Sequence, residues 1–137
     1  MKVTISTVIE KPIDEVVFAL IDKDEQLQRE GYQDIKLIEG IQNTEGSLEM
    51  ITNQVGTQLS RSVINVNLPH SITYHLHEAH MEFEHHFREH DDHVHYKLIV
   101  RSVGNKVFQF LSNFLKRKVE RTMNEIVQEF KKYCESK

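Results

Sequence analysis

The chain has 137 residues, enough for one domain with a hydrophobic core and too few for two ordinary domains. Its formal net charge of -4, with histidine counted as neutral, gives no general attraction to nucleic acid or to anionic membranes. The single cysteine, Cys134, excludes an internal disulfide and a zinc site built on cysteine pairs. Since no apolar run is long enough to span a bilayer, we expect one cytoplasmic domain, residues 1–137, without stable membrane insertion.

The first part of the chain predicts a strand followed by two short helices. Apolar and polar residues alternate over residues 2–9, as in a strand with one buried face. A helix is expected over residues 12–21, because proline suits its first position and acidic residues suit its first turn. Asp24 as amino-terminal cap and Gly31 as terminal glycine then bracket a second, shorter helix.

Residues 33–103 form short runs typical of strands, with glycine or proline at the joins. The expected strands are 35–39, 47–53, 58–67, 72–77, 81–89 and 94–103. From Asn105 onward, apolar residues recur at intervals of three and four, which predicts one long amphipathic helix of about seven turns or more. We interpret its basic run, residues 116–121, as a solvated helix side and not as a site for nucleic acid or lipid head groups.

All nine histidines lie between His70 and His95, in the segment where apolar and polar residues alternate. Successive side chains of a strand point to opposite faces, so the alternation divides the histidines between the two faces of the sheet. Only His85 falls on the apolar face.

A tight hairpin at Asp91-Asp92 is the expected turn of this segment, because aspartate tolerates turn geometry and accepts hydrogen bonds from nearby backbone N–H groups. The turn fixes the register of the two strands that it joins. The expected pairs are Phe87 with Tyr96, His85 with Leu98, Phe83 with Val100 and, on the outer face, Glu82 with Arg101. A slip of one residue would turn every side chain to the other face.

The order of strand, two helices, six strands and a closing helix resembles the START-like, or SRPBCC, superfamily over essentially the whole chain. The resemblance rests on residues 10–18, which lead from the first strand into a helix, on the Leu68-Pro69 break, and on the closing helix. It implies the α+β helix-grip fold of Bet v 1-like proteins and polyketide cyclases. In that fold a curved antiparallel sheet of about six to seven strands wraps around a long C-terminal helix, and two short helices follow the first strand. The resemblance also implies a hydrophobic cavity between sheet and helix, but no particular reaction.

The side chains on the apolar face are our candidates for lining that cavity. They are Tyr74, Phe83, His85, Phe87, Tyr96 and Leu98 from the strands, and Phe110 and Phe114 from the long helix. A buried His85 would be a neutral donor and acceptor that orients a ligand or acts as a general base. The alternative is a core histidine tied to a tyrosine or backbone partner, and the lack of an evident orienting carboxylate favours it.

The outward histidines and glutamates carry atoms that bind Zn, Ni or Cu, but their spacing defines no four-ligand site. We therefore expect no metal and no other cofactor, and we interpret this face as solvated or partner-facing. A homodimer formed through it would weaken below about pH 6, where protonated histidines repel one another.

The sequence thus predicts non-covalent binding of a small hydrophobic or amphipathic molecule, lipid-like or aromatic, in the cavity. Two alternatives stay open. One is a polyketide cyclase- or dehydrase-like enzyme in which His85 or a cavity tyrosine moves a proton. The other is a protein-interaction module that uses the histidine-rich sheet face. The absence of a recognisable catalytic motif favours a protein that is not an enzyme.

Overall fold

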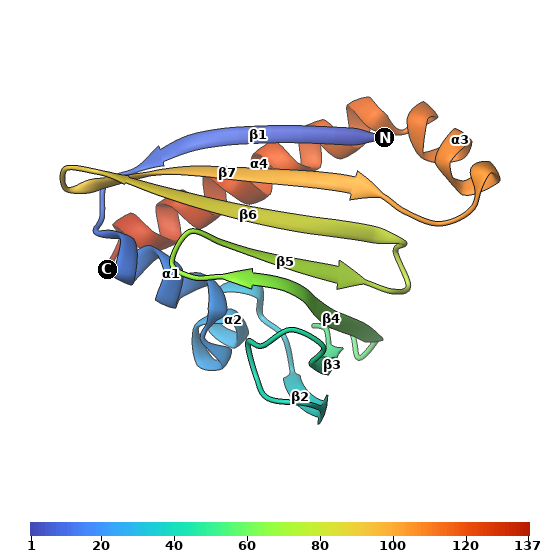
Figure 1. Ribbon diagram of the computed structural model, residues 1–137, viewed down its shortest axis with the longest axis horizontal. Coiled ribbons are helices and arrows are strands. Elements are labelled where there is room, and N and C mark those ends of the chain that lie inside the picture. Colours follow the sequence, from blue (N-terminus) through green and yellow to red (C-terminus); the bar gives the residue numbers. More distant parts are fainter.

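Seven strands form one antiparallel sheet, and most of the helical segments cover one of its faces (Figure 1). This is seen in a computed structural model that describes residues 1–137. The strands are β1 (Lys2–Ile9), β2 (Asp34–Glu39), β3 (Leu48–Thr52), β4 (Gln58–Asn67), β5 (Ser71–Leu76), β6 (Met81–His90) and β7 (His93–Ser102). The helices are α1 (Ile13–Ile21), α2 (Lys23–Glu30), α3 (Lys106–Phe114) and α4 (Lys116–Glu135). The strand order β1-β7-β6-β5-β4-β3-β2 places the first strand beside the last, and the predicted α+β class is confirmed.

The two short helices follow β1 as expected, but the predicted cap of α2 is wrong. Asp22, not Asp24, precedes the helix in an extended conformation, and its carboxylate accepts a hydrogen bond from the backbone N–H of Glu25 at 3.1 Å. The earlier cap lets α2 begin directly after α1 ends at Ile21. Gly31 closes α2 with a left-handed backbone, φ 68, as expected of a terminal glycine.

The turn between β6 and β7 lies at Asp91-Asp92, as predicted. Asp91 has a left-handed backbone, φ 55, which aspartate tolerates better than most residues. The strand register confirms all four expected pairs: Phe87 with Tyr96, His85 with Leu98, Phe83 with Val100 and Glu82 with Arg101. The Arg101 guanidinium forms its ion pair with Glu84, diagonally along β6, and not with Glu82 directly opposite.

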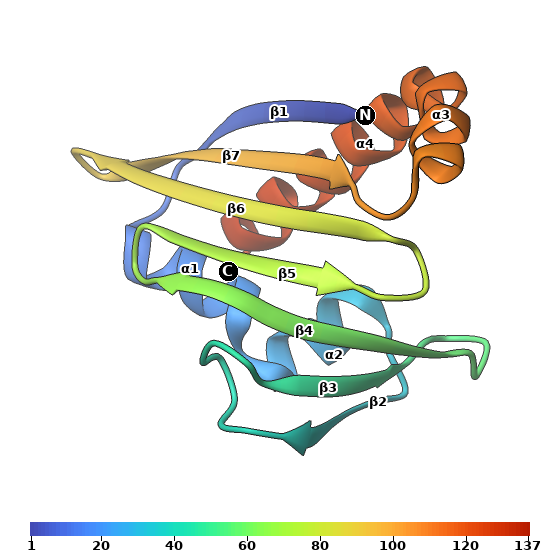
Figure 2. The same ribbon diagram turned by 45° about the vertical axis from the view of Figure 1, so that its right-hand side comes forward.

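Residues 105–137 form two helices and not the single long helix that the periodicity predicted. The first, α3, ends at Phe114, and Leu115 leaves the helical conformation before α4 resumes at Lys116. The apolar spacing continues through the break, so the pattern carries no sign of it. The 20-residue α4 is the long C-terminal helix and packs along β1, whereas α3 lies at the corner of the molecule beyond the end of β7 (Figure 2). None of the helices is both long enough and apolar enough to cross a bilayer.

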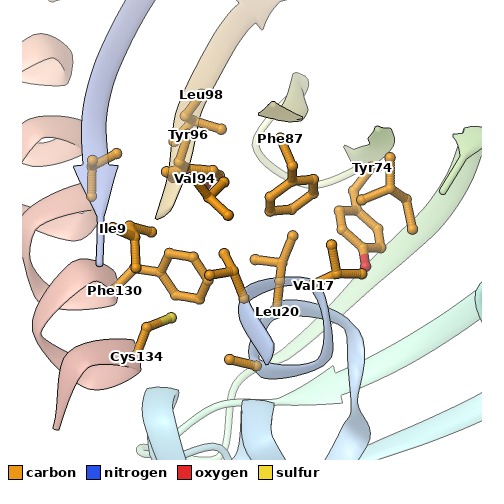
Figure 3. Close-up of a cluster of buried hydrophobic side chains, with 14 of the residues drawn as sticks. Ile9, Val17, Leu20, Tyr74, Phe87, Val94, Tyr96, Leu98, Phe130 and Cys134 are labelled. Carbon is orange, nitrogen blue, oxygen red and sulfur yellow. The ribbon is translucent and has the colours of Figure 1, made fainter. Parts of the chain in front are cut away.

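The hydrophobic core lies between the sheet and helices α1 and α4 (Figure 3). Ile9 of β1, Tyr96 of β7, Leu20 of α1 and Phe130 of α4 meet there, and each is 6% exposed or less. Burial of side chains of this size stabilises the fold by about 1.5–3 kcal/mol each. Cys134 of α4 belongs to the same cluster, and burial raises the pKa of its thiol to about 11.

The cap of α2 can be tested by comparing two neighbouring aspartates. Asp22→Ala removes the acceptor for the Glu25 N–H and should lower the free energy of unfolding by about 1 kcal/mol. Asp24→Ala, an exposed position within the helix, should change it by much less. Chemical denaturation of both variants measures the difference, and equal losses would contradict the assignment of the cap to Asp22.

Candidate functional site

A cavity of about 230 Å³ lies between the sheet and helices α2 and α4. Its apolar wall comes from both layers. The sheet contributes Ile51, Leu76, Phe83 and Leu98, and the helices contribute Leu20, Met123, Ile126 and Phe130. Its polar lining comprises Gln26, Arg29, Glu30, Tyr32, Arg61, Tyr74, His85 and Tyr96. Because Tyr32, Tyr74 and Tyr96 present apolar rings as well as hydroxyls, most of the lining is apolar, and the polar groups come from α2, the segment after it, β4, β5, β6 and β7.

Five of the eight residues expected from the sequence line this cavity. They are Tyr74, Phe83, His85, Tyr96 and Leu98. Phe87 lies on the same sheet face but belongs to the core, where its ring is 5.5 Å from that of Tyr96, centroid to centroid. Phe110 and Phe114 do not reach the cavity: they are 62% and 75% exposed on α3, because the chain turns aside at Leu115.

His85 is held by a tyrosine. Its Nδ1 lies 2.7 Å from the Tyr96 hydroxyl, and its ring meets the Tyr74 ring edge-on with centroids 5.7 Å apart. Burial, reinforced by the positive charges of Arg29 and Arg61, lowers the pKa of His85 from 6.5 to about 3. At neutral pH the imidazole is thus uncharged, and Nε2 has no hydrogen-bond partner within the protein.

The two arginines of the lining were not among the residues singled out from the sequence. Arg61 of β4 lies opposite Glu49 of β3, and its Nη2 and Nε are 3.0 and 3.3 Å from one Glu49 oxygen. Glu49 is only 2% exposed, so this is a buried ion pair behind the cavity wall. Strand parity is the sequence signal that could have identified Glu49 and Arg61. Glu49 stands two positions from Ile51 and Arg61 two positions from Val63, and both apolar residues are buried on the inner face.

Arg29 reaches the cavity from α2. One guanidinium nitrogen donates to the Ala19 carbonyl, and Nε donates to Glu30 at 3.1 Å. The guanidinium also lies over the Phe130 ring, 5.2 Å from its centroid. A helix as short as α2 shows no apolar stripe in its sequence, so its inward face could not be assigned from the pattern.

Tyr74 carries the one fully buried side-chain polar atom of the lining that has no hydrogen-bond partner. Its hydroxyl is buried and forms no hydrogen bond within the protein, while Arg61 lies 4.5 Å above its ring. Burial raises the pKa of Tyr74 to about 12, so the hydroxyl stays protonated and able to donate. A buried hydroxyl without a partner is costly, which is a reason to expect that a bound molecule satisfies it.

The outer histidines lie on the opposite face of the sheet. The rings of His90, His93 and His95 have centroids 5.4–6.0 Å apart near the β6–β7 turn, and His86 and His95 border an open depression of about 590 Å³. This hollow is larger than the cavity but is lined mainly by polar side chains of the outer surface. No three His, Cys, Asp or Glu side chains of the protein are arranged to hold a metal ion.

Comparison with known proteins identifies the fold. No known protein family matches the sequence, and neither does any curated protein. Among solved structures, the Bacillus halodurans protein BH1534 has a TM-score of 0.76 at 11% identity, over 98% of this chain and 96% of that one. Ara h 8.0201 has a TM-score of 0.71 at 12% identity, over 100% and 99%. DynU16, a protein of the dynemicin biosynthetic locus, has a TM-score of 0.75 at 11% identity, over 98% of this chain and 47% of that one.

These likenesses show that the chain has the Bet v 1-like helix-grip fold, as the resemblance in sequence implied. At such low identity they describe the fold alone. The side chains in the cavity have to be interpreted from their own chemistry.

The neutral state of His85 makes stability depend on pH. The unfolded chain takes up a proton on this imidazole near the ordinary pKa of 6.5, whereas the folded protein does so only near 3. Stability contributed by His85 is therefore lost as pH falls below about 6.5. At pH 5 the loss is roughly 1–2 kcal/mol, from about 1.36 kcal/mol per pKa unit.

His85→Gln should remove that part of the pH dependence, while His70→Gln, at an exposed position, should keep it. Urea denaturation of the wild type and both variants at pH 7 and pH 5 measures the effect. Equal pH dependence in all three proteins would show that His85 is not held neutral by the fold.

The buried pair of Glu49 and Arg61 predicts strong coupling between the two residues. Arg61→Met leaves a buried carboxylate without its partner and should cost about 3–5 kcal/mol of stability. The double variant Glu49→Leu/Arg61→Met should recover most of that loss. Lys23→Met, which breaks the exposed pair with Asp34, provides the control and should cost less than about 1 kcal/mol. A double variant no more stable than Arg61→Met would argue against the coupling.

Proposed function

We propose that this protein binds a small amphipathic molecule in the cavity between the sheet and helices α2 and α4. The observation that carries the proposal is a predominantly apolar cavity with an unpartnered buried hydroxyl, that of Tyr74, in its lining. Ligand sites in proteins commonly combine an apolar wall with a few polar groups that fix orientation. A volume of about 230 Å³ is below the roughly 300–1,000 Å³ usual for such sites and favours a compact ligand.

The polar lining offers mainly hydrogen-bond donors. Each guanidinium has five N–H groups, and the contacts of Arg29 and Arg61 to protein acceptors use only some of them. The Tyr74 hydroxyl adds another donor. We therefore expect the polar end of the ligand to present acceptor oxygens, as a carboxylate or a carbonyl does.

The route into the cavity runs between α2 and α4. Arg29, Glu30, Ile126 and Phe130 line both the cavity and a neighbouring groove on the outside of these helices. Ile126 is 40% exposed, so it stands at the border between the cavity and solvent. A ligand can therefore enter without displacing the core that holds α1 and α4 to the sheet.

Binding is favoured over proton-transfer catalysis. His85 and Tyr74 are acid–base groups in one cavity, which is the arrangement that a cyclase-like enzyme needs. An imidazole with a pKa of about 3 is, however, a weak base at neutral pH. The group that orients it is the Tyr96 hydroxyl and not a carboxylate. The cyclase-like enzyme and the interaction module remain alternatives to the binding function.

The location of the site can be tested with a matched pair of probes, decanoic acid and 1-decanol. Both should bind the wild type, the acid more tightly, and Ile126→Trp should weaken both by narrowing the entrance. Ile64→Trp is the control, because Ile64 is 41% exposed on β4 and lies outside the cavity lining. Isothermal titration calorimetry measures the affinities. No binding to the wild type, or an equal effect of the two tryptophans, would refute the proposed site.

The role of the unpartnered hydroxyl requires a separate variant. Tyr74→Phe removes only the oxygen and should weaken decanoic acid about two- to tenfold, the worth of one hydrogen bond. Tyr133→Phe removes a hydroxyl outside the cavity and should leave the affinity unchanged. If both variants bind like the wild type, Tyr74 does not contact the ligand's polar end.

A further inference from the structure

Helix α3 carries most of its apolar side chains on the solvent side, and only Phe108 packs inward, against the His80 ring. Val107, Phe110, Leu111, Phe114 and the adjoining Leu115 are 67%, 62%, 55%, 75% and 55% exposed. Four of them recur at intervals of three and four and so form one stripe along the helix. The rings of Phe110 and Phe114 contact each other edge-on with centroids 5.2 Å apart, which makes the stripe continuous. We call these five residues the α3 stripe.

Polar contacts hold α3 with its polar face toward the protein and its apolar stripe toward solvent. The Asn105 side chain caps the helix by accepting from the Phe108 N–H at 2.8 Å. The Gln109 side chain donates to the Ser102 carbonyl at 2.8 Å and accepts from the Ser102 hydroxyl at 2.6 Å. Ser112 is buried on the same side of the helix. The inward face is thus fixed by hydrogen bonds at the end of β7, and the α3 stripe is left without a partner.

Positive charge flanks the α3 stripe on both sides along the chain. Lys106 precedes it, and Lys116, Arg117, Lys118 and Arg121 follow it, all of them exposed. Between residues 105 and 121 the only acidic residue is Glu120. This corner of the molecule is therefore locally basic, although the whole chain has a formal charge of -4. The sequence pattern alone indicated a solvated helix side for residues 116–121, but in the structure this basic run adjoins the exposed α3 stripe.

We infer that the α3 stripe and its basic flanks dock on the surface of an anionic lipid bilayer. A helix that presents aromatic and aliphatic side chains beside lysine and arginine lies in the plane of such an interface, with its apolar face among the acyl chains. Each basic residue near an anionic surface strengthens the attraction about fivefold. The inference stands on α3 alone and does not require the cavity to be occupied.

A second copy of the chain is a poorer occupant of this surface. A symmetric dimer brings the same patch of both copies together. Since both flanks of the α3 stripe are basic, basic residues of one copy would then lie near basic residues of the other, and like charges at an interface disfavour association. An anionic bilayer satisfies both the apolar and the charged parts of the surface.

Vesicle flotation tests the inference with two lipid compositions. The wild type should float with vesicles of phosphatidylcholine mixed with phosphatidylglycerol, and much less with phosphatidylcholine alone. Phe110→Ser and Phe114→Ser should each weaken binding about tenfold, since each removes a large apolar side chain from the interface. Phe18→Ser is the matched control, because Phe18 is 55% exposed on α1 and lies outside this corner.

The charged flank needs its own variants. Lys116→Gln and Lys118→Gln should each weaken binding to the mixed vesicles about fivefold, and Lys36→Gln on β2 should not. Failure of the wild type to float with the mixed vesicles would overturn the inference. Equal binding to both lipid compositions, or an equal effect of Phe18→Ser and Phe110→Ser, would also overturn it.

Light scattering in the absence of lipid measures the oligomeric state and so tests whether a second copy of the chain covers the α3 stripe. A monomer that floats with anionic vesicles supports the inference. A dimer that Phe110→Ser converts to a monomer, with no vesicle binding by the wild type, would assign the α3 stripe to self-association instead.

Discussion

The pairing of β6 with β7 determines which side chains face the helices. Its turn at Asp91 sets a register that runs without a bulge from His90 opposite His93 to Met81 opposite Ser102. Because β7 also pairs with β1, and β6 with β5, this register is carried across the β1 end of the sheet. Phe83, His85 and Leu98 face the helices as a result, and the other histidines are directed to the outer surface or its edges.

The cavity beside α2 exists because each helix covers a different part of the sheet. Helix α4 packs along β1, and α2 packs against α1 and β2, so neither covers the middle of the sheet completely. The groups that border this space are ordered by contacts outside it: Arg61 by Glu49, Arg29 by the Ala19 carbonyl, and His85 by Tyr96. Their positions are therefore fixed by the protein alone, which would lower the entropic cost of the proposed binding.

Local patterns in the sequence predicted most of the fold, but only five of the sixteen residues that line the cavity. Strict alternation places Tyr74, His85 and Tyr96 on the inner face, because strand parity depends only on neighbouring residues. Parity also places Arg61 on the inner face, but an inward guanidinium is expected only beside a partner such as Glu49 on another strand. Arg29 lies on α2, whose sequence has no apolar stripe to show which face is inward. The break at Leu115 was equally hidden. Hydrogen bonds of Gln109 with Ser102 at the end of β7 orient α3 before the break, and the apolar spacing runs through the break unchanged.

Cys134 gives the protein a built-in reporter of helix detachment. It is the only thiol, it is 4% exposed among the side chains that fasten α4, and its raised pKa keeps it protonated. A thiol reagent reacts with the thiolate and needs access to sulfur, so modification requires α4 to separate from α1 and β1. The rate of alkylation of the native protein therefore measures how often this end of α4 opens, without any engineered label.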